Sequence, residues 1–280
     1  MKPTLFVPLA FVFLVMNNIS LSQTGYEPGD KIDLMLSVEL KKVDSVFIYD
    51  YRLTNRPSAT QELYYFAILP SGLNTISQIC APKNWHAILF KDEPQMIKWL
   101  ADVKDDEDKY VDPLKPGSSL QSFQLATFSL PGLISFYAEG DHEIPHFPEG
   151  MATDSIPGYT DLTPYGPGII GKTVGPVMPV GPIVLASFFD TLISYKHQAL
   201  ALKWIDNQGI ANSLDQKLDA AKKKLEGGDN SAARNILQAF VNEVEAQKDK
   251  HLTSEAYALL KFNAEFLIDR LATGGKEGKK

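Results

Sequence analysis

The sequence predicts an α+β protein with more than one domain: an N-terminal antiparallel β-sandwich of immunoglobulin-like kind, followed by a C-terminal antiparallel helical bundle. Between residues 31 and 140, apolar and polar residues alternate along several short runs, as in half-buried strands. Between residues 186 and 272, apolar residues recur every three or four positions, as on the buried face of a helix. A stretch rich in proline and glycine separates the two patterns.

The N-terminal segment has the pattern of an export signal. Lys2 supplies a positive start, an apolar run extends from Leu5 to Met16, and small residues precede a predicted mature start at Gln23. The run is shorter than the roughly 20 residues of a membrane-spanning helix. Residues 1–22 are therefore predicted to be a signal peptide. The mature protein is expected to be secreted or part of a bacterial cell envelope, with no membrane span; a retained N-terminal anchor is the alternative.

The composition restricts the classes of function. The chain is 44% hydrophobic and 22% charged, as expected of a globular protein, and its formal net charge is −7. That mild acidity argues against a nucleic-acid partner, which would require a basic face. Cys80 is the only cysteine, so no disulfide can form within the chain. A buried thiol is the favoured interpretation of Cys80, because a free cysteine packs as a small apolar residue.

Residues 23–144 are predicted to form the sandwich from about seven or eight strands. The strand-like runs are Ile32–Leu40, Phe47–Leu53, Leu63–Leu69, Trp85–Phe90, Ile97–Val103, Leu120–Phe128 and Leu133–Ala138. Antibody domains carry a Cys–Trp–Cys signature that this chain lacks, so only the architecture is predicted.

A group of tyrosines on these strands leaves two interpretations open. Exposed on one face, they would form an aromatic strip suited to a glycan. Core positions are favoured, because tyrosine is usually at least half-buried. The residues are Tyr49, Tyr51, Tyr64 and Tyr65.

An acidic run lies within the sandwich region. A solvated loop is the favoured interpretation, because runs of charge usually face water. A calcium site is the alternative, since Ca²⁺ takes roughly six to eight oxygen ligands, although the spacing is not that of an EF-hand. The candidate ligands are Asp105, Asp106, Asp108 and Asp112.

The segment His142-Glu143-Ile144-Pro145-His146 fits the H-E-x-x-H pattern of zinc hydrolases. That pattern works on a helix, where both histidines share one face and the glutamate acts as general base. Pro145 removes a backbone donor and disfavours helix at the residue before it. A coincidental match is therefore favoured, and a zinc site formed by His142, Glu143 and His146 is the alternative. No other cofactor is predicted.

Residues 145–185 are predicted to be a connector, because the density of proline and glycine there disfavours helices and central strands. The connector is either a linker or a segment ordered against one of the two domains. Gly166 to Thr173 formally matches a phosphate-binding loop. Such a loop requires a strand before it and a helix after it. The flanking prolines exclude that helix, so the match is interpreted as coincidence.

Residues 186–272 are predicted to form the helical domain, beginning with a helix over Phe188–Trp204. Gly209 is predicted to end it in a left-handed cap, and Asn212 or Ser213 to cap the next helix. The run from Gly227 to Asn230 should separate the second helix from the third, and Thr253 should cap the fourth. The tail, residues 273–280, is predicted to be disordered.

The helical stretch from about residue 204 to 271 resembles the FIMAH domain, a helical module found near the C-termini of bacterial secreted and surface proteins. The resemblance implies an extracellular accessory module and no catalytic residue. The residues that carry it are Ile205, Asn207, Gly209-Ile210, Asn212-Ser213-Leu214, Lys217-Leu218, Ala221, Gly228-Asp229, Ala232-Ala233, Asn235, Leu237, Phe240, Val244, Ala246-Gln247 and Lys250.

The leading functional hypothesis is a secreted, non-enzymatic binding or surface-associated protein. In it the sandwich recognises an extracellular protein or glycan and the helical module assists. A metal-dependent hydrolase using the His142–His146 segment is one alternative, and a structural spacer without a ligand is another. An enzyme is disfavoured because no nucleophile motif such as G-x-S-x-G occurs.

Overall fold

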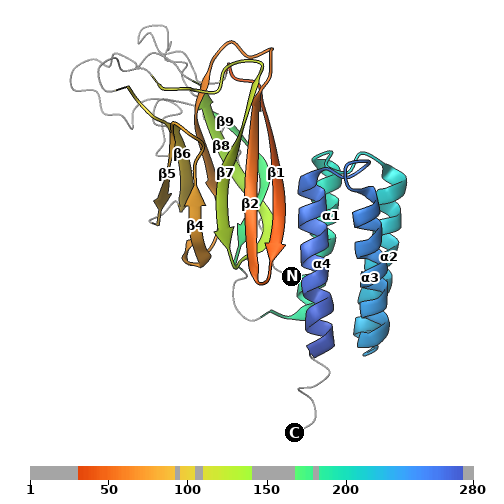
Figure 1. The fold of residues 1–280 in the computed structure, drawn as a ribbon. Coiled ribbons are helices and arrows are strands. Elements are labelled where there is room, and N and C mark those ends of the chain that lie inside the picture. The colour runs from red at the N-terminus through yellow and green to blue at the C-terminus, as the bar shows by residue number, and fades with distance from the viewer. Residues whose placement is uncertain (1–30, 92–94, 105–109, 141–167, 179–182, 274–280) are drawn as a thin grey trace, which may run out of the picture.

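The computed structural model describes residues 31–91, 95–104, 110–140, 168–178 and 183–273. They form two layers of antiparallel sheet with a helical bundle beside one edge of the sandwich (Figure 1). The predicted α+β fold class, a β-sandwich followed by a helical bundle, is confirmed. The predicted signal peptide lies outside the described residues, as does the predicted tail after Thr273.

The described strands form a four-stranded sheet in the order β1-β2-β7-β4 and a five-stranded sheet in the order β5-β6-β3-β8-β9. Neighbouring strands are antiparallel throughout. The strands are β1 (Leu34–Val43), β2 (Val46–Asn55), β3 (Leu63–Leu69), β4 (Ile76–Cys80), β5 (Trp85–Phe90), β6 (Met96–Ala101), β7 (Ser118–Thr127), β8 (Leu130–Gly140) and β9 (Ile169–Val177).

This strand order is that of an immunoglobulin constant-type sandwich with one inserted pair of strands. In that fold, strands A, B, E and D form one sheet and C, F and G the other. Taken in chain order, β1, β2, β3, β4, β7, β8 and β9 occupy positions A to G. The inserted β5 and β6 extend the second sheet, because β6 pairs with β3. The immunoglobulin-like architecture thus follows from the topology.

Aromatic side chains fill the space between the two sheets. Phe66 stacks on Trp99 with ring centroids 5.4 Å apart, and Trp85 meets Phe123 edge-on at 5.1 Å. Rings of this size bury a large apolar area each, which helps to stabilise a sandwich that has no disulfide. The tyrosines predicted to be core residues are all buried, which confirms that prediction: Tyr49, Tyr51, Tyr64 and Tyr65.

The described part of the predicted connector, residues 145–185, contains the strand β9. β9 pairs with β8 along its whole length and forms an edge of the five-stranded sheet. An edge strand tolerates proline, since one row of its backbone groups has no partner strand. Its glycines serve close packing: a Cβ at Gly171 would collide with Phe136, and one at Gly175 with Ile134. The sequence pattern was typical of turns, but here it reflects crowding between strands.

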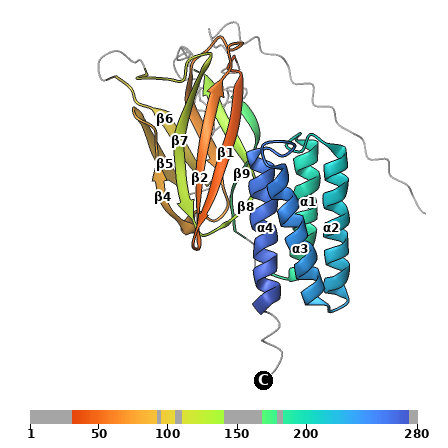
Figure 2. The same cartoon turned by 45° about the vertical axis from the view of Figure 1, so that its right-hand side comes forward.

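The helices are α1 (Leu185–Ala201), α2 (Gln208–Glu226), α3 (Asn230–Gln247) and α4 (Ser254–Thr273). Each helix packs against the next, and α1 also packs against α4, which closes an antiparallel four-helix bundle (Figure 2). Its core is formed by the predicted apolar stripes, including Leu214, Leu218, Leu237 and Phe240. The helical spacing of the sequence is thereby confirmed as a buried stripe.

The predicted boundary between α1 and α2 is wrong, whereas the later boundaries are confirmed. Asn207, not Asn212 or Ser213, caps α2: its Oδ1 accepts from the backbone N–H of Gly209 at 2.8 Å. Gly209 therefore lies in the first turn of α2 and does not end α1. The left-handed residue after α1 is Lys203, at φ 60°.

The confirmed boundaries involve the residues that the sequence singled out. Gly228 adopts φ 77° between α2 and α3, and the side chain of Asp229 accepts from the N–H of Ala232 to cap α3. The hydroxyl of Thr253 lies 3.5 Å from the N–H of Ala256 at the start of α4.

Helix α4 joins the bundle to the sandwich. Phe262 is buried in the sandwich core, where its ring meets Phe47 edge-on at 5.6 Å. The carboxylate of Glu255 accepts from the backbone N–H of Val38 at 3.1 Å, on the outer edge of β1. This contact satisfies a backbone donor that an uncovered edge strand would leave free. In both views α4 lies beside β1 (Figures 1 and 2).

Candidate functional site

Most of the residues predicted as metal ligands lie outside the described part of the chain. This holds for the zinc candidates His142, Glu143 and His146, and for the calcium candidates Asp105, Asp106 and Asp108. Asp112 is described: its carboxylate accepts from the side-chain amide of Asn84, and its carbonyl accepts from the indole N–H of Trp85 at 3.2 Å. Within the described residues, no group of three or more His, Cys, Asp or Glu could hold a metal ion.

The described part of the phosphate-loop match has strand geometry. Gly171, Lys172 and Thr173 all belong to β9, and the ammonium group of Lys172 donates to the hydroxyl of Ser135 on β8 at 2.9 Å. A phosphate loop instead wraps its backbone N–H groups around the anion at the start of a helix. These residues therefore do not form one.

The outer face of the four-stranded sheet carries a polar hollow, which we call the sheet hollow. Its volume is about 300 Å³, and it is lined by Ser37, Glu39, Asp50, Arg52 and Gln121. These side chains come from β1, β2 and β7, on the side of the sheet opposite the aromatic core. The hollow offers hydrogen-bond donors and acceptors in solvent, with one guanidinium and two carboxylates.

Internal hydrogen bonds hold the sheet hollow in shape. A guanidinium nitrogen of Arg52 donates to Oε1 of Gln121 at 2.6 Å. Asp50 accepts from the backbone N–H of Ser122 at 3.0 Å and from the amide of Gln124 at 2.9 Å. Ser122 sits in a β-bulge at φ 78°, a conformation that costs energy for a residue with a side chain. The carboxylate of Asp50 thus stabilises an irregular backbone directly under the hollow.

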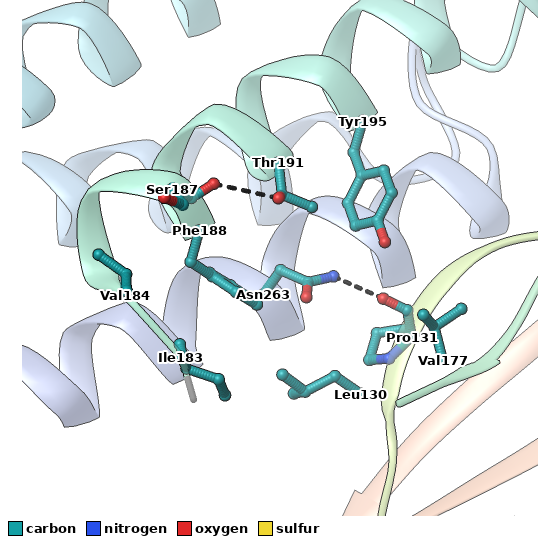
Figure 3. Close-up of a pocket in the computed structure, with 10 residues that line it drawn as sticks. All are labelled: Leu130, Pro131, Val177, Ile183, Val184, Ser187, Phe188, Thr191, Tyr195 and Asn263. Carbon is teal, nitrogen blue, oxygen red and sulfur yellow. Dashed lines mark hydrogen bonds between the residues drawn. The ribbon is translucent and has the colours of Figure 1, made fainter. Parts of the chain in front are cut away.

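A second hollow, the joint pocket, lies where the bundle meets the sandwich (Figure 3). Its volume is about 240 Å³. The walls come from the start of β8, the end of β9, the residues entering α1, the first half of α1, and α4: Leu130, Pro131, Val177, Ile183, Val184, Ser187, Phe188, Thr191, Tyr195 and Asn263. No charged side chain is among these described lining residues.

Two polar groups of the joint pocket are positioned by the fold. Asn263 is only 1% exposed, and its amide nitrogen donates to the carbonyl oxygens of Pro131 at 2.8 Å and Leu259 at 2.7 Å. Tyr195 packs against Gly132, where an added Cβ would lie 2.8 Å from the tyrosine hydroxyl. Burial raises the pKa of the Tyr195 hydroxyl, so this group stays neutral at physiological pH.

The sandwich also buries an acid. Glu139 on β8 is fully buried and lies opposite Tyr65 of β3. Burial raises the pKa of Glu139 to about 8, while the hydroxyls of Tyr137 and Tyr64 interact with the carboxyl group and oppose the rise. A buried acid with a pKa near neutrality is a candidate functional group. It opens to neither of the two hollows described above.

Sequence reasoning missed both hollows. The joint pocket combines residues as far apart as Leu130 and Asn263, on elements that meet only in the folded chain. A weak signal for the sheet hollow existed: polar residues alternate on β2 at Asp50 and Arg52, so they share one face. That period says nothing about which residues of β1 and β7 would stand beside them.

The helices bear a family signature. Residues 197–269 match the FIMAH domain. The match confirms the resemblance, and it runs from His197 in α1 to Asp269 in α4. The FIMAH domain thus includes the residues of α4 that contact the sandwich, among them Glu255, Phe262 and Asn263. The first half of α1, which supplies most of the bundle's side of the joint pocket, precedes the match.

Two further comparisons concern the whole chain. No curated protein matches it. A solved structure, described as that of an uncharacterized protein from Nocardia farcinica with an immunoglobulin-like fold, is 12% identical in sequence. The likeness covers 48% of this chain and 94% of that one, with a TM-score of 0.30. The immunoglobulin-type assignment therefore rests on the strand order. None of the described helices is long and apolar enough to cross a membrane.

Proposed function

We propose that the protein is an exported, surface-associated binding protein whose sandwich recognises a glycan or a protein outside the cell, with the FIMAH domain as an accessory module. A FIMAH domain beside an immunoglobulin-type sandwich fits a surface-associated protein. The observation that carries the binding part of the proposal is the sheet hollow. It is polar, pre-shaped and lies on the sheet face opposite the core.

The chemistry of the sheet hollow favours a glycan over an apolar ligand. A sugar hydroxyl both donates and accepts, so it can bridge a carboxylate and a guanidinium or amide. Asp50, Arg52 and Gln121 offer these groups within one hollow. Because the Arg52–Gln121 and Asp50–Gln124 hydrogen bonds already order the side chains, less conformational entropy is lost on binding.

The test is a glycan-array screen of the mature protein, followed by titration of the best ligand against variants. Arg52→Ala and Gln121→Ala should each weaken binding about tenfold, because each removes a hydrogen bond to the ligand. Lys172→Ala is the matched control: this exposed cation lies on β9 of the other sheet and should leave the affinity unchanged.

The same experiment can reject the proposal in two ways. If a glycan binds equally to wild type and Arg52→Ala, the sheet hollow is not the site. If neither glycans nor extracellular matrix proteins bind the wild type, the spacer interpretation replaces the binding one. Thermal melting of each variant must match that of the wild type, so that a loss of binding is not a loss of fold.

Export is a separate part of the proposal and rests on the pattern of residues 1–22. Expression in a bacterial host should place the protein outside the cytoplasm with Gln23 as its first residue. N-terminal sequencing of the exported protein checks this. An uncleaved chain in the membrane fraction would favour the retained anchor instead.

A further inference from the structure

The joint pocket contains a hydrogen-bond acceptor, Oδ1 of Asn263, to which none of the described residues donates. Both amide protons of Asn263 are donated, one to Pro131 and one to Leu259. These two bonds define the orientation of the amide, because a flipped amide would place its oxygen against two carbonyl oxygens. No hydrogen bond among the described residues reaches Oδ1, and Figure 3 shows this oxygen turned away from Pro131.

Oδ1 is not among the fully buried side-chain atoms without a partner, so water in the pocket can reach it. Asn263 is 1% exposed, so bulk water reaches it only through the pocket. A molecule in the pocket that presents an O–H or N–H group to Oδ1 would take the place of water as its hydrogen-bond donor.

The remaining walls define the rest of the ligand. Phe188, Ile183 and Leu130 surround the space next to Asn263 with apolar surface (Figure 3). Because no charged side chain is among the described lining residues, an ionised ligand would lose its hydration without compensation. The volume of about 240 Å³ exceeds the roughly 150 Å³ of an engineered cavity that holds benzene. A molecule of about ten non-hydrogen atoms therefore fits.

We propose that the joint pocket binds a small neutral molecule with an apolar ring system and a single O–H or N–H donor directed at Oδ1 of Asn263. The site is independent of the sheet hollow and of the glycan or protein recognised there. The ligand contacts the sandwich through Leu130 and Pro131 and the bundle through Phe188 and Asn263. It therefore stabilises the docked arrangement of the two parts, because a ligand that binds only the assembled state shifts the equilibrium toward it.

The test uses indole and benzofuran as probes on the full mature protein. The two molecules have nearly the same shape, but indole presents an N–H donor and benzofuran presents an oxygen in its place. Isothermal titration should show indole binding more tightly by a factor of up to about ten, the ratio expected for one net hydrogen bond. Indole should also raise the melting temperature, and benzofuran should raise it less.

A pair of matched variants locates the binding. Ser187→Phe places a ring at the pocket rim and should weaken indole binding at least about tenfold by filling the space. Ser194→Phe makes the same change at an exposed position two turns along α1 and should leave binding unchanged. Asn263 itself is not replaced, because its amide also ties α4 to β8 and its loss would disturb the fold.

Each opposing result overturns the proposal. Equal affinities for indole and benzofuran would mean that Oδ1 of Asn263 does not select a donor. Unchanged indole binding in Ser187→Phe would place the ligand elsewhere. Absence of indole binding up to a concentration of about 1 mM would show that the pocket does not hold such a molecule.

Discussion

At the residue scale, the molecule buries a small number of ionisable groups, and each has a measurable consequence. Glu139 is the clearest, because burial raises its pKa from 4.5 to about 8. The folded protein therefore binds a proton that the unfolded chain has lost between these pH values. Stability contributed by the neutral acid is fully present below about pH 4.5 and is lost as pH rises through about 8.

The first prediction follows from the upward direction of the Glu139 pKa shift. The unfolding free energy of the wild type should fall between pH 5 and pH 8, with a slope of up to about 1.4 kcal/mol per pH unit from Glu139. Glu139→Gln stays neutral and should flatten the profile over that window. Urea unfolding at several pH values measures both. Parallel profiles for the two proteins would show that Glu139 is not the titrating group.

The second prediction concerns Lys196, whose ammonium group is buried between α1 and α2 and paired with Asp215. Asp215→Ala would leave that charge buried without its partner, at a cost of about 3 kcal/mol in unfolding free energy. The control is Asp190→Ala, which breaks the exposed Lys222–Asp190 pair between the same two helices and should cost less than about 1 kcal/mol. Equal losses measured by urea unfolding would contradict the distinction between the two pairs.

At the element scale, the observed cap of helix α2, Asn207, lies five residues before the first cap that the sequence predicts, Asn212. Both Asn207 and Asn212 are amides with helix-cap chemistry, and the local sequence does not rank them. The chain chooses Asn207 because Ile205 pairs with Leu252 of the neighbouring loop and the N–H of Asp206 bonds to His251 at 3.1 Å. The connection between helices is thereby held by a distant segment, which sets where α2 starts.

The third prediction tests which of these two asparagines caps α2. Asn207→Ala removes the acceptor for the N–H groups of Gly209 and Ile210 and should cost about 1 kcal/mol. Asn212→Ala, at an exposed position inside the helix, should change stability by less than about 0.5 kcal/mol. Thermal or urea unfolding measures both. A larger loss at Asn212 would restore the cap position predicted from the sequence.

At the scale of the whole molecule, the FIMAH domain and the sandwich share buried surface. Phe262 belongs to the sandwich core although it lies on a helix of the bundle. We therefore expect the two parts to unfold together in the wild type, because the loss of either exposes the surface of the other. The contacts by Glu255 on β1 and Asn263 on β8 strengthen this coupling.

The fourth prediction tests the coupling. Phe262→Ala should cost about 3–5 kcal/mol and should split one unfolding transition into two. Circular dichroism follows the helices, and fluorescence follows Trp85 and Trp99 of the sandwich core in a Trp204→Phe background. Phe266→Ala is the control, since that ring packs on Phe188 within the bundle; it should lower stability less and keep the transitions coincident.

Parts of both functional surfaces follow from local sequence, and parts do not. The alternation along β2 puts Tyr49 and Tyr51 on one face and Asp50 and Arg52 on the other, but only the structure shows that the tyrosine face is the core. The helical stripes and the break between α2 and α3 in the run from Gly227 to Asn230 were predicted, because each depends on residues that are close together in the sequence. The joint pocket could not be predicted, because its walls belong to elements as far apart in the sequence as Leu130 and Asn263.

The sequence by itself determined the hydrophobic repeat of each strand and helix. It therefore also determined that a strand-rich part is followed by a helical part, which matches the FIMAH domain. Only the tertiary structure decided that the glycine-rich segment containing Gly171 and Gly175 pairs as an edge strand, and that α4 covers the edge of β1. Hydrophobic periodicity indicates which residues of a segment share a face, but it does not indicate which other segment packs against that face. Val38 and Glu255 are 217 positions apart, so their contact depends on how the assembled surfaces fit together.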